Sequence, residues 1–313
     1  GKIIDSYQTI FGIRTVRFDA NNGFFLNGKS VKIKGTNLHQ DHAGVGVAVP
    51  DALHEYRIRR LKEMGSNAIR TAHNPPAPAF LDACDRLGML VLDENRLMGI
   101  NQEHLSYLEN LIKRDRNHPS VILWSLGNEE WAIEGNVKGA RIGLTMQDFA
   151  NRLDSSRAVT TAVSGGWDWG TGTVMQVMGY NYIVQGDIDQ HHKKFPWQAG
   201  IGTEESNTIG TRGIYVTDDA ACHKAPSNRM PENVGTEYGW KFYSERPYLA
   251  GLFYWTGFDY HGESNPYEWP AVSSQYGIVD LCGFPKDIFY FLKAWWSDDP
   301  VLHIYPHWNW KGK

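Results

Sequence analysis

Residues 89–130, "MLVLDENRLMGINQEHLSYLENLIKRDRNHPSVILWSLGNEE", decide the fold class. Two short apolar runs, 89–96 and 120–130, each end in polar residues and are typical of buried strands. Between them, residues 104–117 have the composition of a helix. The stretch therefore predicts a strand–helix–strand unit, with the strands parallel and the crossover right-handed.

The same alternation runs along the chain. Strands are predicted at 30–38, 67–76, 89–96, 120–130, 158–163, 173–183, 195–206 and 248–260. Helices are predicted at 51–65, 79–88, 104–117, 140–153, 232–247 and 285–298, and 217–230 is expected to be a long loop. Eight such strands predict an α/β fold, a (β/α)8 TIM barrel. A doubly wound sheet is the alternative, but "KGTNLHQDH" (34–42) is no glycine-rich phosphate loop.

An N-terminal β-hairpin is expected before the first barrel strand, because Asn27-Gly28 separates two β-rich runs. We predict a lead-in and hairpin over residues 1–28 and a catalytic barrel over 29–313, with the hairpin closing the barrel floor. No internal repeat is evident.

Composition excludes several classes of function. The chain has 313 residues, of which 42% are hydrophobic and 21% charged, which is enough apolar material for a large core. Its net charge of −4, without a block of Lys or Arg, predicts no nucleic-acid partner and no membrane partner. No apolar run approaches the roughly 20 residues of a membrane helix. No signal peptide is recognisable, so the localisation stays open, and three cysteines indicate no disulfide framework.

Polar and aromatic side chains collect where the predicted strands end, which is where sites lie in such barrels. Any one of them is more often an ordinary loop residue, but the whole set on one rim is not explained in that way. Glu129 and Glu204 follow the fourth and seventh strands and suggest glycoside hydrolysis, with the two carboxyl groups roughly 5 Å apart. Spacing alone does not separate them from their neighbours Glu130 and Glu205.

Several motifs together resemble the catalytic barrel of glycoside hydrolase family 2, close to its bacterial β-galactosidases. They are "HQDHAGVG", "RTAHNPP", "LDENR", "SLGNEE", "GIGTEES" and "GLFYWTGFDY", and the likeness runs from "FGIRT" (11–15) to "HWNW" (307–310). The resemblance implies a retaining, exo-acting hydrolase of terminal β-galactosides that forms a covalent glycosyl-enzyme.

The resemblance also implies roles for individual residues. Glu129 would be the general acid/base and Glu204 the nucleophile. Asn128 would bind the sugar 2-hydroxyl, and Tyr182 would hydrogen-bond the nucleophile. The other implied substrate or supporting residues are His39, His73, Trp255 as a stacking floor, and Arg70 near the nucleophile, with Asp41 as a further substrate-binding candidate.

Each assignment has a structural alternative. His39 and His73 are also compatible with hydrogen-bonded core histidines, Trp255 with plain core, and Arg70, Asp93 and Glu94 with ordinary barrel ion pairs. Glu129 makes sense at a strand end if burial raises its pKa, so that the carboxyl stays protonated and serves as an acid. Glu130 is expected to be structural.

No cofactor and no metal is predicted. Larger family members hold magnesium with a Glu and a His after the third strand, and "DENRLMGI" (93–100) has no such pair. His39, His42 and His73 suggest a metallohydrolase as an alternative, but that class begins with His-x-His rather than "HQDH".

The usual family chain carries a jelly roll and an immunoglobulin-like domain before the barrel. Residues 1–15 resemble the end of such a domain, so we expect this chain to be a fragment of a longer protein. A homo-oligomer is compatible with that full-length protein. We find no Asn-x-Lys element of the kind that binds a uronate after the last strands, which favours galactose. A β-glucuronidase, a β-mannosidase and a non-catalytic carbohydrate-binding barrel are the alternatives.

Overall fold

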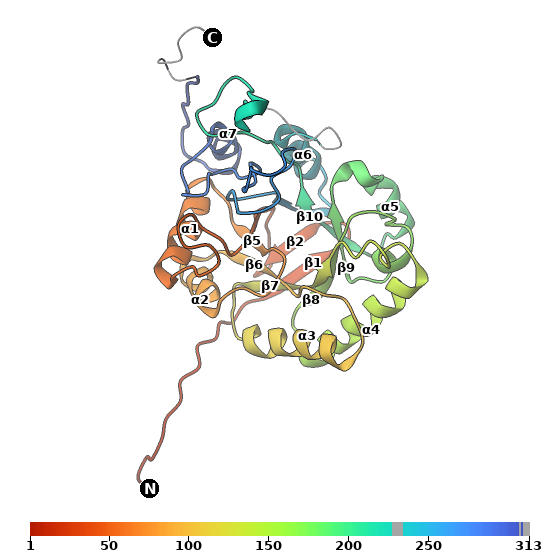
Figure 1. Cartoon of the computed structure of the whole chain (residues 1–313). Helices are drawn as coiled ribbons and strands as arrows, with labels where there is room; N and C mark the ends of the chain where they lie inside the picture. The colour runs from red at the N-terminus through yellow and green to blue at the C-terminus, as the bar shows by residue number, and fades with distance from the viewer. Residues whose placement is uncertain (227–233, 307, 309–313) are drawn as a thin grey trace.

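The computed structural model describes residues 1–226, 234–306 and 308, and it contains a closed barrel of parallel strands ringed by helices (Figure 1). Around the barrel the strands follow the order β10-β11-β4-β5-β6-β7-β8-β9. Their bounds are β4 (Ile33–Leu38), β5 (Ala68–Thr71), β6 (Leu90–Glu94), β7 (Val121–Asn128), β8 (Ala158–Val163), β9 (Val177–Asn181), β10 (Ala199–Glu205) and β11 (Leu249–Tyr254). Each of the eight predicted strands contains one of these, and the predicted (β/α)8 barrel is confirmed.

The helices cover the outside of the barrel in Figure 1. They are α1 (Asp51–Glu63), α2 (Pro78–Leu87), α3 (Gln102–Asp115), α4 (Val137–Leu153), α5 (Ile188–Lys194), α6 (Thr236–Ser244) and α7 (Asp287–Trp296). The predicted helix 232–247 corresponds to α6, and its residues 232–233 lie outside the described part. Of the predicted loop 217–230, residues 219–221 form a short 3-10 helix and 227–230 are not described.

One helix was missed by the sequence prediction, and the last barrel strand was predicted too long. Helix α5 was not predicted, because its seven residues are too few to show a helical period, although Asp187 caps its start by accepting a hydrogen bond from the Gln190 N–H. The last strand was predicted to reach Tyr260, but β11 ends at Tyr254. Beyond it the backbone pairs with a distant segment instead, as in the 2.9 Å bond from the Ile278 N–H to the Thr256 carbonyl.

The predicted N-terminal hairpin is present and has an additional strand. Strands β1 (Val16–Asp19), β2 (Gly23–Leu26) and β3 (Lys29–Ser30) form an antiparallel sheet. The turn between β2 and β3 has Asn27 at φ 51° and Gly28 at φ 76°, the left-handed pair that a two-residue hairpin requires. Figure 1 draws residues before this sheet as an extended segment that leaves the barrel.

Phe24 of β2 ties the hairpin to the barrel interior. Its side chain is 1% exposed and belongs to the same cluster as Ile33, Leu92, Ile122 and Phe253 of the barrel strands. A larger apolar cluster fills the space between the strands and the helices. The hairpin and the barrel thus share a core, and the division of the chain at residue 28 remains a prediction.

Candidate active site

The carboxyl ends of the barrel strands bring the predicted site residues to one rim. Arg70 lies in β5 and Glu204 in β10, while Asn128 is the last residue of β7 and Glu129 follows it. Four more predicted residues come just after strand ends: His39, His73, Tyr182 and Trp255.

Glu204 is buried and is held by two donors. The Tyr182 hydroxyl donates to Oε1 at 2.6 Å, and Arg70 Nη1 donates to Oε2 at 3.1 Å. His73 Nε2 lies 4.0 Å from Oε2. Burial raises the pKa of Glu204, while the neighbouring His73 and Arg70 act in the opposite direction. The same burial, together with the Glu204 carboxylate, raises the pKa of the Tyr182 phenol well above its usual range, so Tyr182 keeps its proton and donates it to the hydrogen bond.

Glu129 stands at the start of the loop after β7, in a left-handed backbone conformation with φ 48°. Asn181 Nδ2 donates to its Oε1 at 2.9 Å, and the Trp131 indole N–H lies 3.3 Å from its Oε2. The side chain is only half-buried, because it lies at the open end of the strand. Glu129 was expected to be buried, and the structure instead leaves it partly open to solvent.

Asn128, Asn181 and Arg70 connect the two glutamates. Asn181 Nδ2 is 3.3 Å from Asn128 Oδ1, and Arg70 Nη2 donates to that same oxygen at 2.7 Å. Because Arg70 also bonds to Glu204, a short chain of side-chain hydrogen bonds links Glu129 to Glu204. The negative charge of Glu129 is close enough to raise the pKa of Glu204 further.

Arg70 is fixed by acceptors on four other strands. Glu94 of β6 accepts from Nε at 2.8 Å and from Nη2 at 2.9 Å, and Asn37 of β4 accepts from Nη1 at 2.9 Å. Burial alone would raise the pKa of Glu94, but Arg70 and His73 outweigh it and lower that pKa. Glu94 is thus an ion-pair member, as the structural alternative proposed, and it belongs to the support of the site.

The histidines and Trp255 form an aromatic wall. The His73 ring stacks on Trp255 with 5.1 Å between centroids, and His39 lies 4.3 Å from the ring of Tyr260. Burial, followed by the charges of His73 and Arg70, lowers the pKa of His39 to about 3, so this imidazole is neutral. Its Nε2 is buried and has no hydrogen-bond partner among the described residues. That nitrogen therefore has an unused hydrogen-bonding capacity within the described part of the chain.

Trp255 differs from its predicted role as an open stacking floor. It is 2% exposed and has the His73 ring against one face, so little of the indole is accessible. The Asp41 carboxylate, a predicted substrate-binding group, is bonded to His261. The His261 N–H donates to Asp41 Oδ2 at 2.7 Å, and the imidazole Nδ1 lies 2.8 Å from the same oxygen.

The glutamates that follow the two candidates point elsewhere. Glu205 Oε2 accepts from the Ile183 N–H at 2.8 Å and from the Tyr243 hydroxyl at 3.2 Å, on the outer side of the barrel. Glu130 Oε1 lies 3.4 Å from the Met98 N–H. The structure thus distinguishes Glu129 from Glu130 and Glu204 from Glu205 by their contacts, which the sequence spacing could not do.

Sequence reasoning missed Asn181 at this rim, which lies inside the motif "GYNY" but had no assigned role. Glu94 and Tyr260 were placed at strand ends by the sequence, but without a catalytic role. The Tyr260 hydroxyl donates to Glu263, a rim carboxylate that no sequence pattern indicated. The position of Asn181 at a strand end was the only signal in the sequence. Its role became visible through its hydrogen bond to Glu129 of another strand end.

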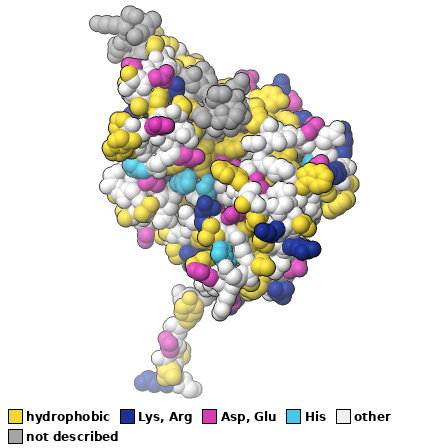
Figure 2. All heavy atoms as spheres, turned by 45° about the vertical axis from the view of Figure 1, so that its right-hand side comes forward, with side chains coloured by type: hydrophobic (Ala, Val, Ile, Leu, Met, Phe, Trp, Pro, Cys, Tyr) yellow, Lys and Arg dark blue, Asp and Glu magenta, His cyan; other side chains and the backbone are white. Residues whose placement is uncertain are grey.

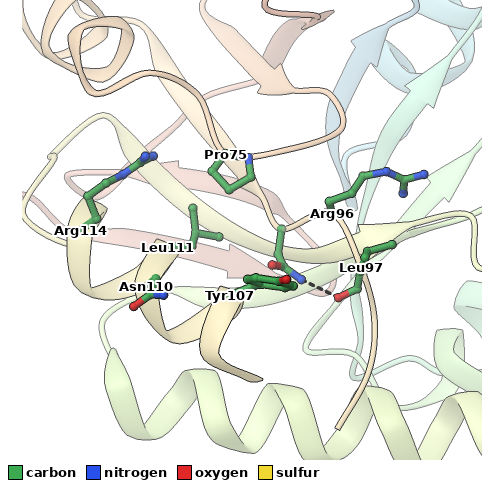
Figure 3. Close-up of a pocket in the computed structure, with 8 residues that line it drawn as sticks. Pro75, Arg96, Leu97, Tyr107, Asn110, Leu111 and Arg114 are labelled. Atoms are coloured by element: carbon green, nitrogen blue, oxygen red, sulfur yellow. Dashed lines mark hydrogen bonds between the residues drawn. The ribbon is translucent and has the colours of Figure 1, made fainter. Parts of the chain in front are cut away.

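A cavity of about 320 Å³ lies beside this rim and contains none of the predicted site residues (Figure 3). Its lining comes from the loops after β5 and β6 and from α3, and includes Pro75, Leu97, Tyr107 and Leu111. In Figure 3 the Arg96 guanidinium points away from Tyr107. The cavity is mainly apolar and holds no carboxyl group among its lining residues.

Three further features concern metal ions, charged partners and membranes. Asp82, Asp85 and His118 come close enough to hold a metal ion, but they lie near the start of β7, at the opposite end of the strand from the site. On the face shown in Figure 2, Lys and Arg side chains are scattered among acidic and neutral ones. Within the described residues, no helix has the length and apolar character needed to cross a membrane.

The fold and the rim together define a TIM barrel with a pair of carboxyl groups at its mouth, an arrangement typical of glycoside hydrolases. The sequence profile of glycosyl hydrolases family 2, TIM barrel domain, matches residues 18–104 and 99–279. The chain belongs to this family, as the resemblance of its motifs indicated.

Individual relatives agree with this assignment. The chain is 36% identical to beta-galactosidase BoGH2A of Bacteroides ovatus, over 98% of this chain and 43% of the relative. It is 30% identical to a beta-glucuronidase of Bacteroides fragilis, over 97% of this chain and 47% of the relative. A solved beta-glycosidase from Bacteroides vulgatus superposes with a TM-score of 0.84 at 33% identity, covering 97% of this chain and 44% of that one. The chain therefore spans less than half the length of these relatives.

Proposed function

We propose that this barrel is the catalytic domain of a retaining, exo-acting β-galactosidase, with Glu204 as the nucleophile and Glu129 as the acid/base. The observation that carries the proposal is the different support of the two carboxyl groups. Glu204 is buried between the Tyr182 hydroxyl and Arg70, whereas Glu129 is half-open to solvent and held by Asn181. A nucleophile needs a fixed position, and an acid/base needs access to the leaving group and to water.

In the first step a Glu204 oxygen attacks the anomeric carbon while the bond to the leaving oxygen breaks and Glu129 gives that oxygen its proton. The product is a glycosyl ester of Glu204. In the second step Glu129, now a carboxylate, takes a proton from water as the water oxygen attacks the anomeric carbon. As that bond forms, the bond between the anomeric carbon and the Glu204 oxygen breaks, and Glu204 returns as a carboxylate, which Arg70 and Tyr182 stabilise.

The supporting groups have distinct tasks in this scheme. Asn128 is placed at the strand end beside Glu129, and we assign it to the sugar 2-hydroxyl. We assign His39, whose imidazole is neutral, to the surroundings of a second hydroxyl. His73 packs against both Glu94 and Trp255, which makes it part of the wall around the sugar. We predict that the two catalytic carboxyl groups lie roughly 5 Å apart, the separation that direct nucleophilic attack requires.

The contacts of Arg70, together with the Glu263 carboxyl group, favour a neutral hexose over a uronate. Recognition of a uronate calls for a free Arg or Lys. All three nitrogens of the Arg70 guanidinium already donate, to acceptors that include Glu94 and Glu204. Glu263, bonded to Tyr260, adds a negative charge near the wall. Beta-glucuronidases occur among the relatives, so glucuronide is the substrate against which this proposal has to be tested.

Hydrolysis of p-nitrophenyl β-galactoside, with the β-glucuronide and the β-mannoside as comparisons, tests the substrate. We expect the galactoside to have the highest kcat/KM. A higher value for the glucuronide or mannoside would transfer the proposal to that sugar. Binding of galactose without hydrolysis of any of the three would favour a non-catalytic carbohydrate-binding barrel.

Variants test the roles. Glu204→Gln should abolish turnover, while Glu129→Gln should retain activity on aryl galactosides, because a good leaving group needs little protonation. Glu130→Gln is the matched control and should behave as wild type.

Azide added to Glu129→Ala should yield β-galactosyl azide, and an α-azide would contradict the assignment.

A further inference from the structure

Trp131 is a large exposed aromatic residue tied to the proposed acid/base. Its side chain is 77% exposed, yet its indole N–H lies 3.3 Å from Glu129 Oε2. The Trp131 backbone N–H also bonds to the Glu129 carbonyl at 2.8 Å. One edge of the ring is therefore fixed to the catalytic loop, while most of its surface remains open to solvent.

The turn that carries Trp131 is anchored on both sides. The Ile133 and Glu134 N–H groups both donate to the Glu130 carbonyl at 2.8 Å. The buried Glu134 carboxylate accepts from the hydroxyl and the N–H of Ser164, in the loop after β8. The Glu134 carbonyl accepts from the Thr171 N–H at 2.8 Å. The backbone that carries the indole is thus held in place before any ligand arrives, which lowers the entropy that binding would lose.

We propose that Trp131 is the platform on which the leaving group stacks, and that the natural leaving group is a ring, namely a sugar residue. The inference rests on the proposed function. The acid must lie beside the oxygen that connects galactose to its leaving group, so a ring fixed to Glu129 lies on the leaving-group side. An indole offers a flat apolar surface that matches the C–H face of a pyranose. Trp255, with little exposed surface, cannot offer such a platform.

Two substrates separate stacking from acid catalysis. A β-linked galactosyl-glucose disaccharide and methyl β-galactoside both have alcohol leaving groups that need the proton of Glu129, but only the first presents a ring to Trp131. We expect Trp131→Ala to lower kcat/KM for the disaccharide about tenfold more than for the methyl galactoside. Trp131→Phe, which keeps a ring and lacks the N–H, should retain most of the preference for the disaccharide.

Trp197 provides a matched control. It is 71% exposed and lies two residues before β10, at the end of the barrel away from the site, so Trp197→Ala should leave both kcat/KM values unchanged. A second readout is transfer from the glycosyl-enzyme to added acceptors. Trp131→Ala should reduce transfer to glucose and leave transfer to methanol at its wild-type share.

Two results would count against the inference. An unchanged substrate ratio in Trp131→Ala would overturn it, and equal losses on both substrates, which give this result, would reduce the role of Trp131 to its hydrogen bond with Glu129. A wild-type protein that cleaves neither substrate would overturn the proposed function and this inference together, which distinguishes that failure from the first.

Discussion

At the scale of single residues, the pair Glu204 and Glu205 shows how neighbours of identical type take different positions. Successive side chains of a strand point to opposite faces, so one of the two had to face the barrel interior. Which one does so depends on register, and β10 has irregular register with both β9 and β11 near these residues. The sequence therefore could not separate them by pattern, and the resemblance to a family motif was needed.

Glu205 supplies a prediction about pH. Burial raises the pKa of this carboxyl from 4.5 to about 8, so between these values the folded protein keeps a proton that the unfolded chain has released. The contribution of Glu205 to stability is therefore greatest below about pH 4.5 and is lost as the pH rises through about 8. The expected slope is at most about 1.4 kcal/mol per pH unit.

Urea unfolding of wild type and Glu205→Gln between pH 5 and 9 measures this contribution. Because glutamine does not titrate, the free energy of unfolding of wild type should fall relative to the variant as the pH increases. Glu245→Gln is the control, since the Glu245 side chain is 59% exposed at the end of α6. Curves for wild type and Glu205→Gln that stay parallel over the whole range would contradict the prediction.

At the scale of elements, apolar runs and turn residues were sufficient to predict most helices and strands. The eight barrel strands were predicted, as were six of the seven α-helices found within the described residues, because their runs are long or periodic, and the Asn27-Gly28 turn predicted the hairpin. Strands were mispredicted where contacts with distant parts of the chain determine whether a strand forms and where it ends. Strand β11 ends early because Thr256 and its neighbours pair with residues 276–279, and strand β1 was missed because its pairing partner β2 defines it.

The hairpin leads to a prediction about the end of the barrel against which it packs. Phe24→Ala should lower the free energy of unfolding by about 3–5 kcal/mol, because the ring is buried among barrel-strand residues and its removal leaves a cavity. Denaturant unfolding followed by tryptophan fluorescence measures the change. Phe11→Ala, at a position that is 68% exposed before the first strand, should stay within about 0.5 kcal/mol of wild type. A small effect at Phe24 would mean that the barrel closes without the hairpin.

At the scale of the whole molecule, the site depends on contacts that no local pattern contains. Arg70 donates to Glu204, which lies 134 residues further along the chain, and to Asn37, Glu94 and Asn128 on three other strands. Strand-end position predicted that these side chains share a rim, and this was correct. Their pairing through one guanidinium follows from closure of the barrel, which brings the strands together only in the folded protein.

Arg70→Met tests whether this contact network holds the barrel and the site together. The change leaves Glu94 and Glu204 buried without their cation, and breaking a buried pair in this way costs about 3–5 kcal/mol of stability. Arg70→Lys should fall between wild type and Met, since lysine keeps the charge but lacks the planar fork that reaches several acceptors. Without Arg70 the pKa values of both carboxyl groups should rise. The stability difference between wild type and Arg70→Met should therefore be widest near neutral pH and narrow as the pH falls and these groups bind protons.

Two measurements on the same Arg70→Met sample distinguish support of the fold from support of the site. The urea midpoint reports the barrel, and the acid limb of kcat/KM for an aryl galactoside reports the pKa of the proposed nucleophile, which should move to higher pH. The control is Arg59→Met, whose guanidinium is 59% exposed and pairs with Glu55 on α1, where a loss of at most about 1 kcal/mol is expected. If Arg70→Met unfolds at the wild-type midpoint and keeps the wild-type acid limb, Arg70 does not connect the five strands in the way that its contacts indicate. A lowered midpoint with an unmoved acid limb would assign Arg70 to the barrel alone.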